Sequence, residues 1–244
     1  EYQIQLNNKL KLAKYRANYA QSLNQLKEID QAIEQNKLSI QLKEELEENK
    51  SLGTSYGVLA NTYFSKGDFS LAFENGIKSL AMCRSNNMIN FEGRLSVIVA
   101  DILLQLGKYS KMMEYVKLAE SILTDFDEPF LMGKLEFMKS HNCLNKGNVE
   151  SAFQHIDSCI DLFDVAEQRP FLIEAYIHKI EILLEKNEFS LAKRVISKIE
   201  LLNKKLQDAP ERPLLEIFKL LHSPDKIERD NIRQIQKQIS TSIP

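Results

Sequence analysis

Apolar residues recur along most of the chain at the spacing of amphipathic helices. The i, i+3, i+4, i+7 pattern is clear in the series Tyr56, Leu59, Ala60, Tyr63. A second series follows a few residues later, with Phe69, Ala72, Phe73 and Leu80. Sustained alternation of apolar and polar residues with β-branched enrichment, the pattern of a strand, does not occur. The chain is therefore predicted to be all-α and built from pairs of helices.

Glycine positions show that these helix pairs repeat. Six of the eight glycines fall on two columns with a period of 40 residues. The columns are Gly53, Gly93, Gly133 and Gly67, Gly107, Gly147. A fixed period of this length indicates a repeat architecture. A glycine between two helical stretches ends the first helix and permits a tight reversal, so each copy is predicted to be an antiparallel helical hairpin.

Three further columns of mostly small residues share the period. They are Ala20, Ala60, Ala100, Ser140, Ile180; Ala32, Ala72, Met112, Ala152, Ala192; and Ser39, Ser79, Ala119, Cys159, Ile199. Small residues allow helix backbones to approach closely where they cross. In the fifth copy Asn187 replaces the turn glycine, and asparagine is among the few residues that tolerate the left-handed conformation. These columns predict the contacts within and between hairpins.

At these offsets the chain resembles the tetratricopeptide repeat family. The resemblance is carried most clearly by Ala60, Tyr63, Gly67, Phe69, Ala72 and Ser79. It implies a right-handed superhelical solenoid of antiparallel helix hairpins with about 11–12 helices. The period of 40 is longer than the family's usual 34 and is similar to the arrays of bacterial signalling and regulatory proteins.

The repeat columns also predict where each repeat and each helix begins and ends. Residues 1–12 are expected to be the leading part, or a remnant, of a first helix, and residues 207–244 a helix pair that caps the array. Five repeats are predicted at 13–52, 53–92, 93–132, 133–172 and 173–206. First helices are predicted near 10–25, 51–66, 90–106, 129–146 and 170–186. Second helices are predicted near 28–47, 68–85, 108–124, 148–164 and 188–207.

Composition narrows the classes of function. The chain has 32 Lys+Arg against 34 Asp+Glu, which argues against a broad nucleic-acid-binding surface. Its longest apolar stretches, such as residues 97–104, are broken by charge well short of the roughly 18 residues that a membrane span needs. We therefore expect no membrane span in this segment and a cytoplasmic location. An extracytoplasmic sensory region is the alternative if an upstream leader or span was removed.

Motifs for catalysis are missing from the sequence. We find no phosphate-binding glycine loop, no Gly-x-Ser-x-Gly and no His-Glu-x-x-His, so a non-enzyme without a cofactor is expected. The spacing of His141, Cys143, His155 and Cys159 is compatible with zinc. However, Cys143 and Cys159 occupy columns of core residues, and Cys83 makes the cysteine count odd. We predict reduced thiols and no bound metal.

The resemblance implies that a ligand binds along the concave wall formed by the first helices. Transferring the family's offsets from the small column gives a candidate groove of polar and apolar residues. These are Asn61, Phe64, Arg94, Asp101, Leu104, Lys134, Phe137 and His141. For floor residues such as Leu104, the alternative is packing against a neighbouring helix.

Two classes of function follow. The leading hypothesis is a non-catalytic protein- or peptide-binding scaffold, the sensory or regulatory repeat region of a larger bacterial signalling protein. The alternative is a structural or assembly module that self-associates or packs against another subunit. We expect a monomer or weak homodimer whose partner is a protein or peptide segment and not a nucleic acid.

Overall fold

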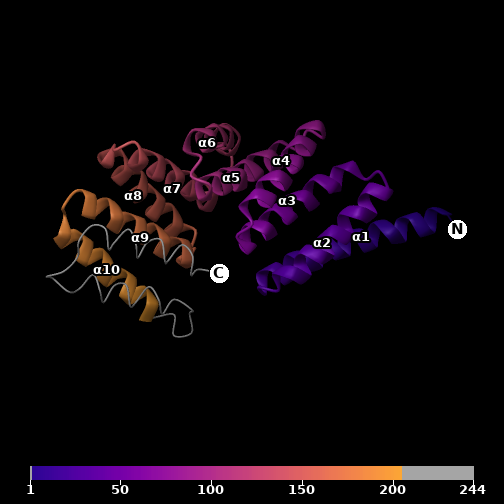
Figure 1. The fold of residues 1–244 in the computed structure, drawn as a ribbon, viewed down its shortest axis with the longest axis horizontal. Helices are drawn as coiled ribbons and strands as arrows, with labels where there is room; N and C mark the ends of the chain where they lie inside the picture. Colours follow the sequence, from indigo (N-terminus) through magenta and orange to yellow (C-terminus); the bar gives the residue numbers. More distant parts are fainter. Residues whose placement is uncertain (1, 205–244) are drawn as a thin grey trace. The chain divides into compact units, whose positions relative to one another are not determined.

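The computed structural model describes residues 2–204, and this part of the chain is helical throughout apart from short turns. It contains ten helices and no strand (Figure 1). They are α1 (Tyr2–Gln25), α2 (Ile29–Glu45), α3 (Asn49–Lys66), α4 (Phe69–Ser85), α5 (Ile89–Gln105), α6 (Tyr109–Leu123), α7 (Pro129–Asn145), α8 (Val149–Val165), α9 (Arg169–Glu185) and α10 (Phe189–Lys204). The all-α prediction is confirmed. The helix predicted near 10–25 is observed as Tyr2–Gln25, so it includes the residues expected to form its leading part. The predicted helix pair at 207–244 lies outside the described residues.

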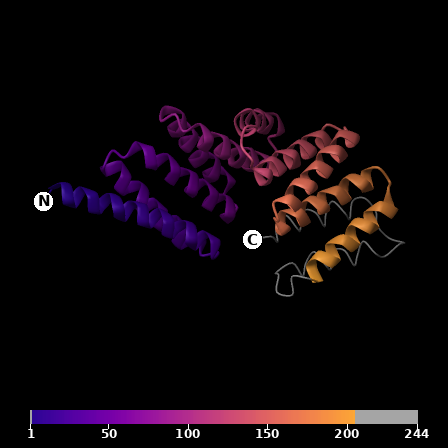
Figure 2. The same ribbon diagram turned by 180° about the vertical axis from the view of Figure 1, so that it is seen from behind.

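The described residues divide into two compact units, one ending at Leu131 and the other beginning at Met132. In the first unit, α1 packs on α2, α3 on α4 and α5 on α6. In the second unit, α9 packs on both α8 and α10. The same pairs lie side by side when the ribbon is seen from behind (Figure 2). Each unit is therefore built from helical hairpins.

The turns within hairpins explain the first glycine column. Lys27, Gly67, Gly107, Gly147 and Asn187 all have positive φ, between 59° and 83°. At Gly107 the chain closes the helix with two backbone hydrogen bonds, from Gly107 to the Leu104 carbonyl and from Lys108 to the Leu103 carbonyl, both 2.9 Å. A residue with no Cβ adopts this conformation without strain. The period of 40 thus reflects one left-handed residue at the end of every first helix.

Substitution at this turn provides a first test. Gly107→Val should lower the free energy of unfolding by about 1–2 kcal/mol, because a β-branched residue is strained at a φ of +66° although the space around it is open. Gly107→Asn is the matched control and should be milder, since Asn187 adopts φ 59° at the equivalent turn. Urea unfolding followed by circular dichroism measures both. Equal loss in the two variants would contradict a conformational origin.

The second glycine column has a different role, in helix spacing. A Cβ on Gly53 would lie 3.0 Å from Met82 Cβ, and one on Gly133 would lie 2.7 Å from the Phe163 ring. The Ser79 hydroxyl donates a 2.6 Å hydrogen bond to the Gly53 carbonyl across the same contact. These glycines therefore let the two helices of a hairpin approach closely.

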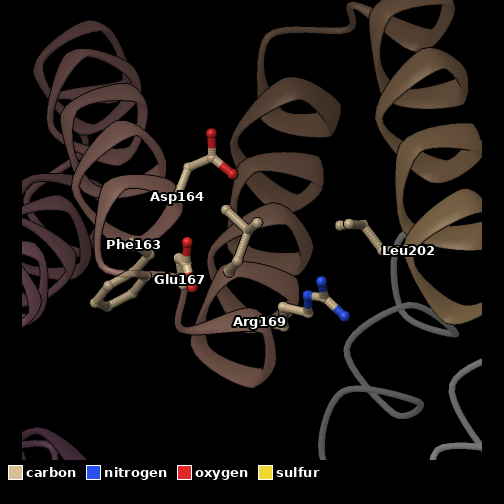
Figure 3. A pocket seen from close by; sticks show the side chains of 6 residues that line it. Phe163, Asp164, Glu167, Arg169 and Leu202 are labelled. Atoms are coloured by element: carbon tan, nitrogen blue, oxygen red, sulfur yellow. The ribbon is translucent and has the colours of Figure 1, made fainter. Parts of the chain in front are cut away.

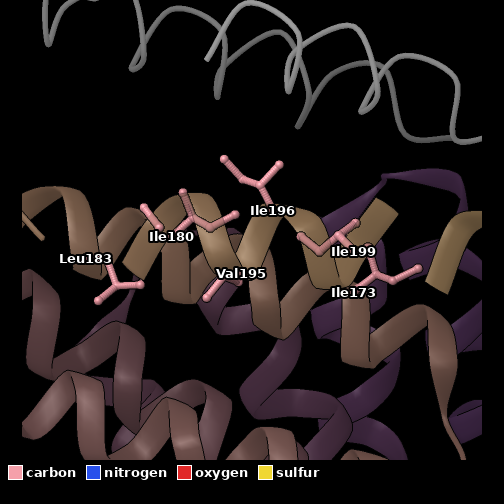
Figure 4. Packing of buried hydrophobic residues seen from close by; sticks show 7 residues of the cluster. Ile173, Ile180, Leu183, Val195, Ile196 and Ile199 are labelled. Carbon is pink, nitrogen blue, oxygen red and sulfur yellow. The ribbon is translucent and has the colours of Figure 1, made fainter. Parts of the chain in front are cut away.

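The predicted small columns form the hairpin cores. All fifteen residues of the three columns are at most 4% exposed. In the last described hairpin the small residues give way to larger ones. There, Ile173, Ile180 and Leu183 of α9 pack with Val195, Ile196 and Ile199 of α10 (Figure 4). Burial of these apolar side chains is the main source of stability.

One hairpin junction is polar instead of apolar. Lys43 is 2% exposed, and its Nζ donates to the Ser51 carbonyl at 3.0 Å and to Ser55 Oγ at 2.6 Å. In the next three copies this position holds Cys83, Leu123 and Phe163, which are all buried. Burial lowers the pKa of Lys43 to about 8. The α2–α3 junction therefore contains a buried amine in place of a hydrophobic side chain.

Within residues 2–204, no helix combines the length and apolar character that crossing a bilayer requires.

Candidate functional site

In the first unit, the predicted groove residues have unequal exposure. Leu104 is only 9% exposed, so it belongs to the core, which is the packing alternative for this residue. Phe64 is partly exposed and packs edge to face on Phe69, with ring centroids 5.6 Å apart. Asn61 is exposed and Asp101 is partly exposed. A ligand on this unit could reach Asn61, Asp101 and part of Phe64.

Arg94 is exposed, but its charge is already matched. Its guanidinium forms an ion pair with Glu128, and its Nε donates a 3.1 Å hydrogen bond to Asn90 Oδ1. Glu128 belongs to the irregular stretch between α6 and α7, and the same ion pair holds that stretch to α5. Because Glu128 already neutralises its charge, Arg94 is a weaker candidate for binding a ligand.

In the second unit, three predicted residues lie along α7. Lys134, Phe137 and His141 are all partly exposed and follow one another at helical spacing. The Lys134 ammonium lies 5.4 Å from the centre of the Phe171 ring at the start of α9. Phe137 and His141 contact each other, with ring centroids 4.6 Å apart. The structure therefore brings these two predicted residues together.

A third ring, which was not predicted, completes this cluster. His178 of α9 stacks on His141, with centroids 3.6 Å apart and planes inclined by 16°. Phe137 meets His178 edge to face at 5.5 Å. His178 is 2% exposed and occupies a column that is apolar in the three preceding copies, at Val58, Ile98 and Met138. A polar residue in an apolar column is the sequence feature that could have identified it.

His178 is hydrogen-bonded at both ring nitrogens. Nδ1 lies 2.8 Å from Glu181 Oε2, and Nε2 lies 3.1 Å from Ser140 Oγ. Ser140 in turn donates a 2.8 Å hydrogen bond to the Ala152 carbonyl. Burial lowers the pKa of both His141 and His178, and the neighbouring His178 lowers the pKa of His141 further. We call Phe137, Ser140, His141, His178 and Glu181 the histidine cluster.

The side chains whose spacing is compatible with zinc contact other protein groups. His155 Nδ1 lies 2.7 Å from Glu136 Oε2, and Glu136 also binds Lys139. Cys159 is buried in the hairpin core, where burial raises its pKa. Among the residues that the structure describes, no three His, Cys, Asp or Glu side chains are arranged to hold a metal ion. Cys83, Cys143 and Cys159 are free thiols.

A hollow of about 450 Å³ opens between α8, α9 and α10 (Figure 3). Asp164, Glu167 and Arg169 give it a charged rim, and Phe163, Leu172 and Leu202 give it an apolar lining. None of these residues was predicted as a site residue. Two carboxylates and a guanidinium over an apolar lining could hold a mixed polar and apolar group.

Comparisons with known proteins identify the class of fold. No family model matches the chain, and no curated protein matches it. A Rap protein solved in complex with competence and sporulation factor superposes with a TM-score of 0.71 at 13% identity, over 88% of this chain and 58% of its own. A signal transduction ATPase with a tetratricopeptide repeat sensor, from Pyrococcus horikoshii, gives 0.65 at 15% identity, over 84% of this chain and 32% of its own.

The tetratricopeptide-like repeats of a putative kinesin light chain from Podospora anserina give a TM-score of 0.60 at 13% identity, over 82% of this chain and 99% of their own. The fold is therefore that of tetratricopeptide-like helical repeat proteins, as the sequence predicts. This chain spans about three fifths of the Rap protein and about one third of the ATPase.

Proposed function

We propose that this chain is a non-catalytic scaffold that binds a peptide or protein segment, and that the exposed edge of the histidine cluster is one binding surface. The observation that carries the proposal is the pair of partly exposed rings, Phe137 and His141, held in place by the buried His178. Pre-positioned aromatic side chains are the usual carriers of binding energy, because little conformational freedom is lost when they are covered.

The likeness to a Rap protein in complex with a factor, and to a repeat sensor within a signalling ATPase, supports a regulatory role. We propose that the chain is the sensory or regulatory repeat region of a larger bacterial signalling protein. Binding by the repeats would then change the activity of another domain. This proposal requires a ligand that the chain recognises on its own.

A displayed library of random twelve-residue peptides, selected on the immobilised chain, tests this. Selected peptides should bind the double variant Phe137→Ala/His141→Ala at least tenfold more weakly, because two central contacts are removed. Binding is measured by fluorescence anisotropy, and circular dichroism checks that the helices remain. Arg169→Ala, which changes the hollow beside α8 and α10, is the control and should bind normally. Failure to select any peptide, or unchanged affinity of the double variant, would contradict the proposal.

The assembly alternative is favoured by one specific observation, on α1. Leu12, Tyr15 and Tyr19 are 43%, 68% and 43% exposed along one side of this helix. The equivalent residues of α3, which are Leu52, Ser55 and Leu59, are at most 4% exposed. Exposed apolar residues in one row are typical of a contact surface. Light scattering after size exclusion should show a dimer that Tyr15→Ser/Tyr19→Ser converts to a monomer if this alternative holds.

A further inference from the structure

The hydrogen bonds of the histidine cluster determine how many protons it holds. A main-chain carbonyl can only accept, so Ser140 donates its single hydroxyl proton to the Ala152 carbonyl. Ser140 Oγ must then accept at its contact with His178, which places a proton on His178 Nε2. The tautomer of His178 is thereby set by its neighbours.

The other nitrogen of His178 needs a second proton. Nδ1 and Glu181 Oε2 are 2.8 Å apart, and two acceptors do not lie at this distance without a hydrogen between them. The shared proton makes the His178–Glu181 pair either an imidazolium with a carboxylate or a neutral imidazole with a carboxyl group. Both forms have no net charge. Glu181 therefore adds no net negative charge to the edge of the cluster.

His141 is the member of the cluster that remains available. Its ring is partly exposed, and it makes no hydrogen bond with any residue that the structure describes. Its face lies 3.6 Å from a ring that already shares a proton, which disfavours a positive charge on His141. A neutral imidazole has one N–H donor and one nitrogen acceptor. A peptide unit offers the matching acceptor and donor.

We propose that His141 hydrogen-bonds the main chain of an extended peptide on this surface, and that His178 is the positioning residue that fixes the His141 ring. The inference rests on the proposed function, since it names the atoms through which that surface binds. Phe137 gives the peptide an apolar contact beside His141. The recognised ligand is accordingly a peptide bound through its backbone and an apolar side chain, not through a charged group.

The test uses a peptide selected on the chain from the random library, with affinities measured at pH 7. His141→Phe keeps an aromatic ring on His178 but removes the hydrogen bonds, and it should weaken binding at least tenfold. Single N-methylation along the peptide should reveal one amide whose methylation weakens binding to the unmodified chain at least tenfold. The same methylation should have little effect on His141→Phe, because that hydrogen bond is already lost.

Two variants of Glu181 separate hydrogen bonding from charge. Glu181→Gln can still donate to His178 Nδ1, so it should bind within about threefold of the unmodified chain, whereas Glu181→Ala should lose binding because His178 is no longer held. Imidazole nitrogen NMR should show His178 protonated at Nε2 in the unmodified chain and in Glu181→Gln.

The results that would contradict the inference differ from those that would contradict the proposed function. Full affinity of His141→Phe, while Phe137→Ala/His141→Ala is impaired, would overturn the hydrogen-bonding role and leave the proposed function intact. Equal loss in Glu181→Gln and Glu181→Ala would show that a basic ligand group is bound by charge, which also overturns the inference. Unimpaired binding by the Phe137→Ala/His141→Ala variant would reject the surface itself.

Discussion

Replacing Gly93 by leucine should lower the free energy of unfolding by about 3 kcal/mol, because this buried contact between two helices has no room for a side chain. A Cβ at this position would lie 2.7 Å from Ile122 Cγ2 and 3.2 Å from Ile122 Cβ. The second atom is next to the α6 backbone, so rotation of the Ile122 side chain does not remove the clash. The two helices of the hairpin would have to separate, which loosens the packing of the buried Leu123 of α6 against α5.

Urea unfolding followed by circular dichroism, with hydrogen exchange in α5 and α6, measures this loss. Exchange is needed because each hairpin of a repeat array contacts mainly its neighbours, so unfolding need not be all-or-none. Gly93→Ala should show a smaller loss in the same direction. Gly93→Leu combined with Ile122→Ala should recover part of the stability. If the leucine variant unfolds like the unmodified chain, α5 and α6 do not approach as closely as described.

Replacing Lys43 by methionine should have the opposite sign and raise the free energy of unfolding by about 2 kcal/mol. One pKa unit corresponds to about 1.4 kcal/mol, so burial, which lowers the pKa of Lys43 from 10.5 to about 8, costs about 3.5 kcal/mol. Loss of the hydrogen bonds to the Ser51 carbonyl and to Ser55 Oγ offsets about 1–2 kcal/mol of this gain. Methionine fills a similar volume without this cost. Ser55 loses its contact with Lys43 but can donate to the Ser51 carbonyl four residues earlier. Lys37→Met, at an exposed position of the same helix, is the control and should change stability little.

The lowered pKa of Lys43 also predicts how the free energy of unfolding depends on pH. Between pH 8 and 10.5 the unfolded chain holds the Lys43 proton more tightly than the folded chain, so this residue makes stability rise with pH in that window. The buried thiols Cys83 and Cys159 have raised pKa values and oppose this above about pH 9, because they ionise more readily when unfolded. The difference between the unmodified chain and Lys43→Met cancels their contribution. It should be largest below pH 8 and shrink towards pH 10, and a constant difference would show that Lys43 is not desolvated.

Much of the repeat architecture could be predicted because it depends on local properties of the chain. The turn glycines at 67, 107 and 147 end helices where they were expected to, since positive φ is a property of one residue and its neighbours. The predicted second helix at 28–47 is observed as Ile29–Glu45, because the apolar period of a helix is visible within one segment. The five-residue stretch before Pro129 was less predictable, since it replaces the three-residue turn that joins the other hairpins.

The candidate site could be predicted only in part. The groove offsets transferred from tetratricopeptide repeats selected Phe137 and His141, which lie together. They also selected Leu104, which is buried. They did not select His178, Ser140 or Glu181 as one network, because these residues are up to 41 positions apart and meet only where α7 packs beside α9. Distances of this kind depend on how two helices are spaced and rotated against each other, and the sequence pattern contains neither quantity.

The sequence alone therefore determined the ten described helices to within a few residues, the turns within hairpins, the repeat period and the small residues of the hairpin cores. Each of these follows from preferences that act over a few residues and recur every 40 positions. The tertiary structure decided which side chains remain accessible, that Arg94 is paired with Glu128, and that His141 stacks on a ring hydrogen-bonded to a carboxylate. Hydrogen bonds and ring stacking act over 3–4 Å and are highly directional, so they exist only after the helices have packed.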